Sequence, residues 1–237
     1  YPAVVLLVMV FVIGFMVLKV LPQVEEVYKG IKGAKLPFIT KALLAFSAFT
    51  RKYWWIELIV VVVLGFFLTR WARTLGGKRY IDKFKMKAWP VGPLFMKMYM
   101  ARFARTSETL VAAGVPLIQT LEIVGKSVNN LHIEESVKKA TEKVKGGKAL
   151  SDSISGDPNF LDLVPNMLKI GEESGSIEQM LGKTADYYEK EVDNQIKTIS
   201  TIIEPVMMVV LGVVAFGLVA AIMMPIYGLV GQSGFGK

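Results

Sequence analysis

The sequence predicts an all-α, polytopic membrane protein with three transmembrane helices and a six-helix cytoplasmic bundle. Three uncharged apolar blocks predict the spans, and a polar region with helical periodicity predicts the bundle. The 237 residues are 53% hydrophobic and 20% charged, whereas an average soluble domain is roughly 25% charged. The lack of cysteine excludes a disulfide scaffold and a thiol-ligated metal site.

The first two apolar blocks are short and flanked by charge. Residues 3–18 carry no charge and end at Lys19, slightly short of the roughly 20 residues that a span needs. Residues 54–68 begin with paired tryptophans and are followed by Arg70, the pattern of an aromatic belt with a basic flank. Glu57 lies one turn inside this block, and we expect it near the headgroups rather than in a buried ion site.

The third block, residues 205–230, is the strongest predicted span because it has no charge at all. Gly212, Gly217 and Ala221 are candidate span-packing residues, since the spacing of the last two lets another helix approach closely. We therefore expect a homo-oligomer. The alternative is that these glycines reflect only the ordinary glycine content of membrane helices.

Prolines bracket the first and third blocks at the same interval. Pro2 and Pro22 are 20 residues apart, as are Pro205 and Pro225. A repeated unit, a soluble domain followed by a span, would explain both pairs. It would also explain the abrupt start at Tyr1, so we expect the natural protein to continue upstream.

Basic residues gather just after the second span. Residues 70–105 contain ten basic residues and one acidic residue, whereas residues 106–200 contain ten basic and fifteen acidic residues. This density favours a cytoplasmic position for residues 70–200. We expect the basic part to contact anionic lipid and no nucleic acid to bind. The acidic part could meet a basic partner, although a solvated surface explains most of its charges.

The region after the basic stretch has the pattern of short helices joined by Gly and Pro turns. The predicted helices are 93–113, 116–128, 132–145, 149–155 and one from near Pro165 to Gly171. Gly114 and Pro116 are structural turn residues between the first two. Ser176, with Gln179 three residues later, predicts the N-cap of a sixth helix that runs into the third span, with Pro205 as a kink.

These elements predict seven segments along the chain. They are transmembrane helix 1 at 1–21, a short periplasmic segment at 22–53, transmembrane helix 2 at 54–69, a basic membrane-proximal linker at 70–92, the cytoplasmic bundle at 93–200, transmembrane helix 3 at 201–231 and a C-terminal tail at 232–237.

Catalytic motifs are not found in this segment. Two Gly-Lys-Ser/Thr runs lack the earlier glycine and the preceding strand of a phosphate-binding loop. The single histidine, His132, has no second ligand cluster beside it, and no nucleophile and base are paired. We expect no enzyme activity, no metal and no cofactor.

Several segments together resemble the inner-membrane platform proteins of type IV pilus and type II secretion machines, the PilC/GspF type. The segments are Leu110–Val124 (LVAAGVPLIQTLEIV), Val144–Ile154 (VKGGKALSDSI), Met167–Leu181 (MLKIGEESGSIEQML), Ile202–Tyr227, Val20–Gln23 and Leu36–Thr40. The resemblance covers essentially the whole chain. It implies a non-enzymatic scaffold in the inner membrane and places this chain as the second half, without the first cytoplasmic domain.

The resemblance also implies partners. They are a cytoplasmic hexameric assembly, retraction or secretion ATPase, pilin or pseudopilin subunits, and other inner-membrane assembly proteins. Candidate residues for partner contact or transmission are Gly171, Glu172, Glu173, Gly175, Glu204 and Pro205. For Glu172 and Glu173 the competing interpretation is that they cap a turn and complement a helix dipole.

Two other functions are weighed against this one. A transporter or channel subunit would need charged or broken helices at mid-membrane, and the third span has no charge. A membrane-tethered nucleic-acid or lipid binder would use the aromatic residues among the lysines of residues 70–105. The spacing of those aromatic residues fits better a membrane-surface helix that leads into a bundle.

Overall fold

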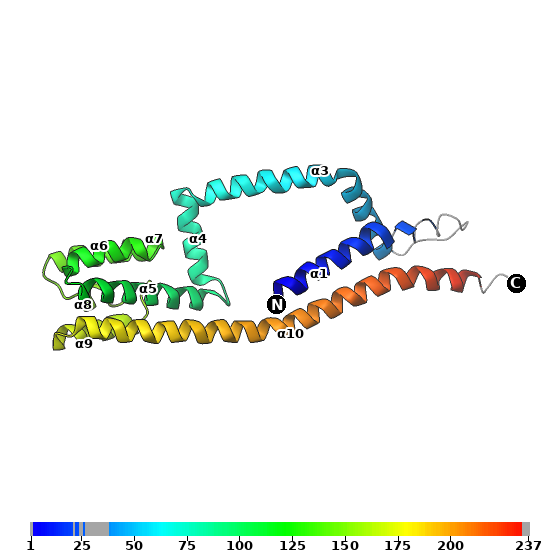
Figure 1. Ribbon diagram of the computed structural model, residues 1–237. Coiled ribbons are helices and arrows are strands. Elements are labelled where there is room, and N and C mark those ends of the chain that lie inside the picture. The colour runs from blue at the N-terminus through cyan, green and yellow to red at the C-terminus, as the bar shows by residue number, and fades with distance from the viewer. Residues whose placement is uncertain (1, 21, 24–25, 27–37, 234–237) are drawn as a thin grey trace. The chain divides into compact units, whose positions relative to one another are not determined.

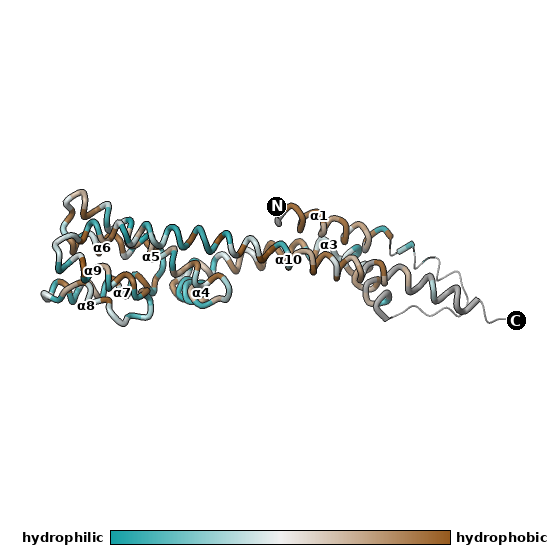
Figure 2. The backbone as a smooth tube through the Cα atoms, turned by 90° about the horizontal axis from the view of Figure 1, so that it is seen from below, coloured by the Kyte–Doolittle hydropathy of each residue, from teal (hydrophilic) through white to brown (hydrophobic). Residues whose placement is uncertain are grey.

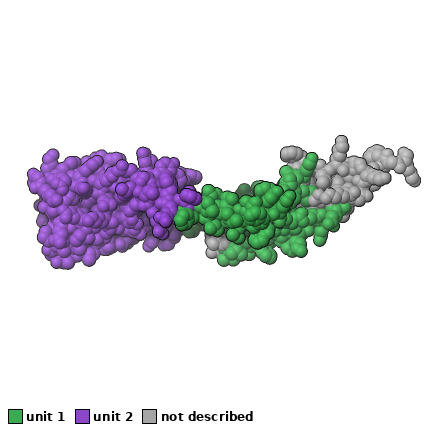
Figure 3. Space-filling view, turned by 90° about the horizontal axis from the view of Figure 1, so that it is seen from above, with its two compact units in different colours: residues 1–66, 200–237 green, residues 67–199 purple. Residues whose placement is uncertain are grey.

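The computed structural model describes residues 2–20, 22–23, 26 and 38–233, and these residues are helical apart from short turns (Figure 1). The all-α prediction is therefore confirmed for the described part of the chain. Residues 27–37 of the predicted periplasmic segment and 234–237 of the predicted tail lie outside it. The chain forms two compact units, unit 1 at 1–66 and 200–237 and unit 2 at 67–199 (Figure 3).

Unit 1 consists of apolar helices. They are α1 (Pro2–Phe15), the short π-helix η1 (Met16–Val20), most of α3 (Phe38–Ala72) and the C-terminal part of α10 (Ile177–Ser233). In the described part of the chain, two helices are long and apolar enough to cross a membrane, within Leu44–Ala72 and Ile177–Gly217. Val4–Val20 is a shorter apolar helix. Figure 2 shows hydrophobic residues along these helices.

Helix α3 begins well before the predicted second span. It already covers residues 38–53, in the second half of the segment predicted to be a short periplasmic connection. The helical dihedral angles are interrupted at Tyr53 (φ −119°, ψ 17°). This interruption immediately precedes Trp54, where the sequence pattern places the start of the apolar block.

Unit 2 contains the helices that the Gly and Pro turns predict, preceded by one helix in the segment 70–92 that was expected to be a linker. They are α4 (Leu75–Lys87), α5 (Gly92–Ala112), α6 (Leu117–Ser127), α7 (Leu131–Lys145), α8 (Leu150–Ile154), α9 (Leu163–Ser174) and the start of α10. The helices predicted at 93–113, 116–128, 132–145 and 149–155 are confirmed to within one residue or so at each end. Gly114 has a φ of 77°, the left-handed conformation that ends α5, and Pro116 directly precedes α6.

The predicted end of the fifth helix is wrong. Gly171 lies inside α9, which continues to Ser174, and Gly175 (φ 68°) is its left-handed C-cap. Gly171 serves close packing instead, because a Cβ atom there would lie 2.9 Å from the Cα of Ile177. The start of α10 at Ile177, directly after Ser176, agrees with the predicted boundary.

A closed hydrophobic core holds unit 2 together. Met100, Phe103, Leu121, Ile133 and Leu168 come from four helices and are at most 1% exposed. The Phe103 ring meets the Phe160 ring edge-to-face at a centroid distance of 5.2 Å. Burying a side chain of this size stabilises the fold by about 1.5–3 kcal/mol, so this core is the main source of stability in unit 2.

Helix α10 is shared by the two units. It runs for 57 residues and continues through Pro205, with residues 177–199 in unit 2 and residues 200–233 in unit 1. The predicted passage of the sixth helix into the third apolar block is therefore confirmed.

Candidate functional site

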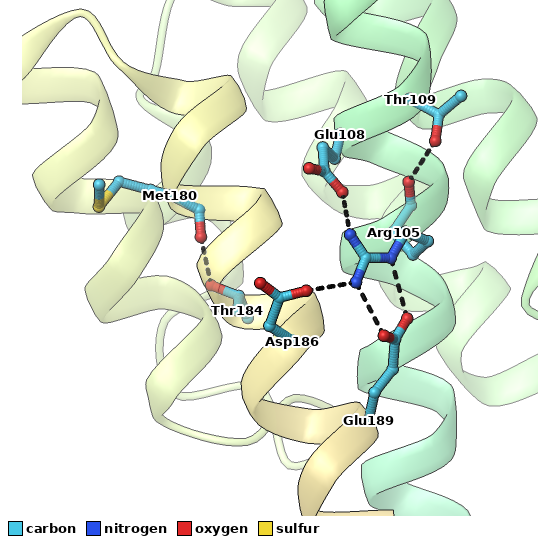
Figure 4. A network of polar contacts seen from close by, with 7 residues as sticks. All are labelled: Arg105, Glu108, Thr109, Met180, Thr184, Asp186 and Glu189. Atoms are coloured by element: carbon cyan, nitrogen blue, oxygen red, sulfur yellow. Dashed lines mark hydrogen bonds and ion pairs between the residues drawn. The ribbon is translucent and has the colours of Figure 1, made fainter.

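A polar network joins α5 to the first part of α10 (Figure 4). The Arg105 guanidinium donates to Glu189 (Nε to Oε1 2.9 Å, Nη2 to Oε2 2.8 Å) and to Asp186 (Nη2 to Oδ1 2.6 Å). On its own helix it also donates to Glu108 (Nη1 to Oε2 2.6 Å). One guanidinium thus binds three carboxylates, two of which lie on the helix that leads into the third apolar block.

The electrostatics of this network favour the ionised forms of Arg105 and Glu189. Hydrogen bonds to Glu189, and then to Asp186, raise the pKa of Arg105, and the hydrogen bond from Arg105 lowers the pKa of Glu189. The Arg105 and Glu189 side chains remain 38% and 49% exposed, so each pair stabilises by no more than about 1 kcal/mol. The network therefore determines how α5 and α10 pair, and it adds little to the free energy of unfolding.

Two further features bring α5 and α10 together. Gly182 on α10 leaves room for α5, because a Cβ atom there would lie 3.0 Å from the Cδ of Glu108. Farther along, the Lys97 Nζ binds the Glu191 Oε2 at 2.8 Å. The helix that connects the units is thus paired with α5 at several successive turns.

The last turn of α9 and the connection to α10 contain four of the predicted site residues, Gly171, Glu172, Glu173 and Gly175. The Glu172 carboxylate accepts hydrogen bonds from the backbone N–H groups of Leu150 (2.6 Å) and Ser151 (3.3 Å) and from the Ser151 hydroxyl. Glu172 thus complements the N-terminus of α8, an earlier helix than the one we expected a cap to serve. Glu173, its neighbour, is exposed.

Helix α4 is bound to α7, although residues 70–92 were expected to form a linker. The buried Asp82 carboxylate accepts from the Leu131 N–H at 3.0 Å, at the N-terminus of α7. The His132 Nε2 lies 3.1 Å from the Arg79 carbonyl, and Arg79 also pairs with Glu135. The single histidine therefore belongs to this contact between helices.

The remaining predicted site residues lie elsewhere in the chain. Glu204 and Pro205, with the span-packing candidates Gly212, Gly217 and Ala221, lie on the part of α10 in unit 1. A Cβ atom at Gly212 or Gly217 would meet nothing within 4 Å. The structure thus gathers the glycine turn in unit 2 and leaves the span residues in unit 1.

Sequence reasoning missed the Arg105 network and the buried Asp82. A usable signal existed for the network, because Arg105 and Glu108 are three residues apart on α5, as are Asp186 and Glu189 on α10. Within the described residues, no group of three or more His, Cys, Asp or Glu side chains could hold a metal ion.

Comparison with known proteins shows which proteins this chain is similar to. Residues 103–225 match the family described as type II secretion system (T2SS), protein F. The type IV pilus assembly protein PilC of Pseudomonas aeruginosa is 36% identical over 230 residues, which cover 97% of this chain and 61% of that protein. The PilC protein of Thermus thermophilus is 34% identical, over 98% of this chain and 57% of its own length. The type II secretion system protein F of Xanthomonas campestris is 31% identical, over 99% and 58%.

The family match covers more than half of the chain, from α5 into the third apolar block. The chain therefore belongs to the type II secretion system protein F family, whose members include type IV pilus assembly proteins. It spans less than two thirds of the length of these relatives. The resemblance predicted from the sequence is confirmed.

Proposed function

We propose that the chain is the second half of a non-enzymatic inner-membrane platform protein, which couples a cytoplasmic hexameric ATPase to the assembly of pilin or pseudopilin filaments. The names of the relatives support this, since they place those proteins in type IV pilus assembly and in type II secretion. Other inner-membrane assembly proteins and a second copy of the chain are further proposed partners.

The proposed topology has three spans. The two long apolar helices and the shorter Val4–Val20 helix supply them, and helices α5 to α9 with the start of α10 are the six-helix cytoplasmic body. The basic residues that follow the second span support this orientation, because positive charge favours the cytoplasmic side. The chain is thus a multi-pass protein of the inner membrane.

One observation supports transmission most strongly: α10 belongs to both units as a single helix of 57 residues. Arg105 and Lys97 bind its first part through Asp186, Glu189 and Glu191. A displacement of unit 2 by the ATPase would move these residues. Because a helix transmits displacement along its axis, Glu204 and Pro205 at the start of the span would move with them.

The contact with the ATPase or a sister domain falls on the α9–α10 turn in this proposal. Glu172 is engaged with α8, whereas Glu173 is exposed. Glu173 is therefore the better candidate for direct partner contact. Gly171 and Gly175 shape the turn that presents it.

The test weakens α10 where it passes from unit 2 into unit 1 and leaves the hydrophobic core of unit 2 unchanged. Thr198, Ser200 and Thr201 are exposed on α10. Changing all three to Gly lowers helix propensity by about 1 kcal/mol per residue relative to Ala, and the matched control changes the same three residues to Ala. Both are installed in the full-length gene of the host strain, and filament assembly and membrane protein level are measured.

The proposal expects the glycine variant to block assembly at an unchanged protein level, while the alanine variant assembles normally. Replacing Pro205 by Ala is expected to impair assembly as well, since it changes the helix at the span entrance. Normal assembly by the glycine variant would refute transmission through α10.

A further inference from the structure

The outward face of α4 combines exposed basic and aromatic side chains. We call the set Tyr80, Lys83, Phe84 and Lys87 the basic-aromatic face, and all four residues are exposed. Arg79 lies at its edge and is paired with Glu135 of α7. Tyr80 and Phe84 are 65% and 63% exposed, and Trp89, just after the helix, is 90% exposed. Large aromatic side chains left in water at this density indicate a surface that has a partner.

The opposite face of α4 is already occupied. Asp82, the one acidic residue between positions 70 and 105, is 3% exposed and accepts from the Leu131 N–H. On the same side of α4, Arg79 pairs with Glu135 of α7. The contact with α7 therefore fixes which side of α4 faces outward, and the outward side carries no acidic residue.

The chain itself holds α4 close to a membrane span. The candidate span ends at Ala72 and α4 begins at Leu75, so at most about 11 Å of extended chain separates them. The Thr74 hydroxyl accepts from the Gly77 N–H at 3.1 Å and starts the helix directly after the span. Whatever surface surrounds the end of α3 is thus within reach of this face.

We propose that the basic-aromatic face binds the surface of an anionic phospholipid bilayer and so fixes unit 2 against the membrane. Lysine ammonium groups reach phosphate and glycerol headgroups, while Tyr, Phe and Trp rings enter the interfacial region. An acidic protein would satisfy the charges, but only a bilayer lies beside the span at all times and accepts the rings too. The inference rests on the proposed function, because it needs α3 to span a membrane.

Spin labels on single cysteines test this contact, and the chain has no native cysteine to interfere. The labels are placed at Phe84→Cys on the face, at Ile170→Cys on α9 and at Val61→Cys in the second span. The last two sites are 52% and 69% exposed in the protein alone. The whole chain is placed in nanodiscs of phosphatidylcholine with or without phosphatidylglycerol, and accessibility to a water-soluble nickel chelate is measured.

The proposal expects the Phe84 label to be several-fold less accessible than the Ile170 label in anionic discs. Changing Lys83 and Lys87 to Gln removes this protection, with an effect of about fivefold per lysine at low salt. The matched control changes Lys138 and Lys139, two exposed lysines of α7, and is expected to have no effect.

Equal accessibility of the labels at Phe84 and Ile170 in anionic discs overturns the proposal. An acidic protein would then be the better partner for the basic-aromatic face. The Val61 label separates this failure from failure of the proposed function. It is protected in both lipids if α3 spans the bilayer, whatever the Phe84 label reports.

Discussion

Units 1 and 2 place the same kinds of apolar side chain in opposite ways. In unit 2, Phe103 and Met100 are at most 1% exposed. In unit 1, Phe216 and Val61 are 76% and 69% exposed. Unit 2 provides its own apolar surroundings, whereas the helices of unit 1 present their apolar surface outward.

This difference explains why the two units need different surroundings, water for unit 2 and a lipid bilayer for unit 1. Exposed apolar surface is unfavourable in water by roughly 25 cal/mol per Å², and a lipid bilayer removes that cost. The stability of unit 2 should therefore depend on its core, and that of unit 1 on the membrane. Paired substitutions, one in each unit, test this.

The largest expected effect is the loss of a core aromatic ring. Phe103→Ala removes the contact with Phe160 and leaves a cavity, which costs about 3–5 kcal/mol. Thermal unfolding of the full chain in detergent, followed by intrinsic fluorescence, should show a clearly lower Tm. Phe216→Ala removes a ring of the same size from unit 1 and should leave the unfolding of unit 2 unchanged. Equal losses in Tm would remove the distinction between the units.

The second comparison uses glycine. Gly171→Ala places a Cβ atom 2.9 Å from the backbone of Ile177, and the overpacking should cost about 1–3 kcal/mol. Gly217→Ala meets nothing within 4 Å in this chain and should not destabilise unit 2. Chemical denaturation in detergent measures both. A harmless Gly171→Ala would show that α9 and α10 can separate freely.

The third comparison sharpens the assignment of two adjacent carboxylates. Glu172→Gln weakens the charge-assisted bonds to the first N–H groups of α8, and should cost about 1 kcal/mol. Glu173→Gln changes an exposed group and should shift stability by less than about 0.5 kcal/mol. Binding of the partner ATPase should show the reverse order. Stability loss in the Glu173 variant alone would contradict the assignment.

The smallest expected effect is the loss of Glu189's contribution to stability at low pH. Because the folded-state pKa of Glu189 is lowered by Arg105, its contribution to stability is complete above the unfolded-state pKa of about 4.3. It is lost as the pH falls through the lower folded-state pKa. The pair is exposed, so Glu189→Gln, which breaks this pair alone, should cost less than about 1 kcal/mol at pH 7. The difference in Tm between the two proteins should shrink from pH 7 to pH 3, and a constant difference would exclude this linkage.

Local signals in the sequence were sufficient to predict most of the helix boundaries in unit 2. Gly114 and Pro116 mark helix ends through backbone preferences that act within a few residues. The helix end predicted at Gly171 was wrong because a glycine that ends a helix and a glycine that allows another helix to pack closely look alike in sequence. Only the approach of Ile177 in the fold distinguishes them.

The partners in the contacts between helices were not predicted, because spacing along one helix does not say which other helix it meets. Asp82 and Leu131 are 49 residues apart, and Arg105 and Glu189 are 84 apart. Which charges pair depends on how α4 meets α7 and how α5 meets α10, and that packing is set by the whole core. The predicted site at Glu172 and Glu173 was therefore found as a segment, while the different roles of its two carboxylates were not.

The most direct test of the account is the sidedness of unit 2. A membrane-impermeant maleimide is applied to spheroplasts that carry a single cysteine, either at Glu173 in unit 2 or at Lys41 before the second span. The account predicts that the cysteine at position 41 is labelled in intact spheroplasts and that the one at position 173 is labelled only after permeabilisation. Labelling of position 173 in intact spheroplasts would place unit 2 outside the cytoplasm and contradict the platform function.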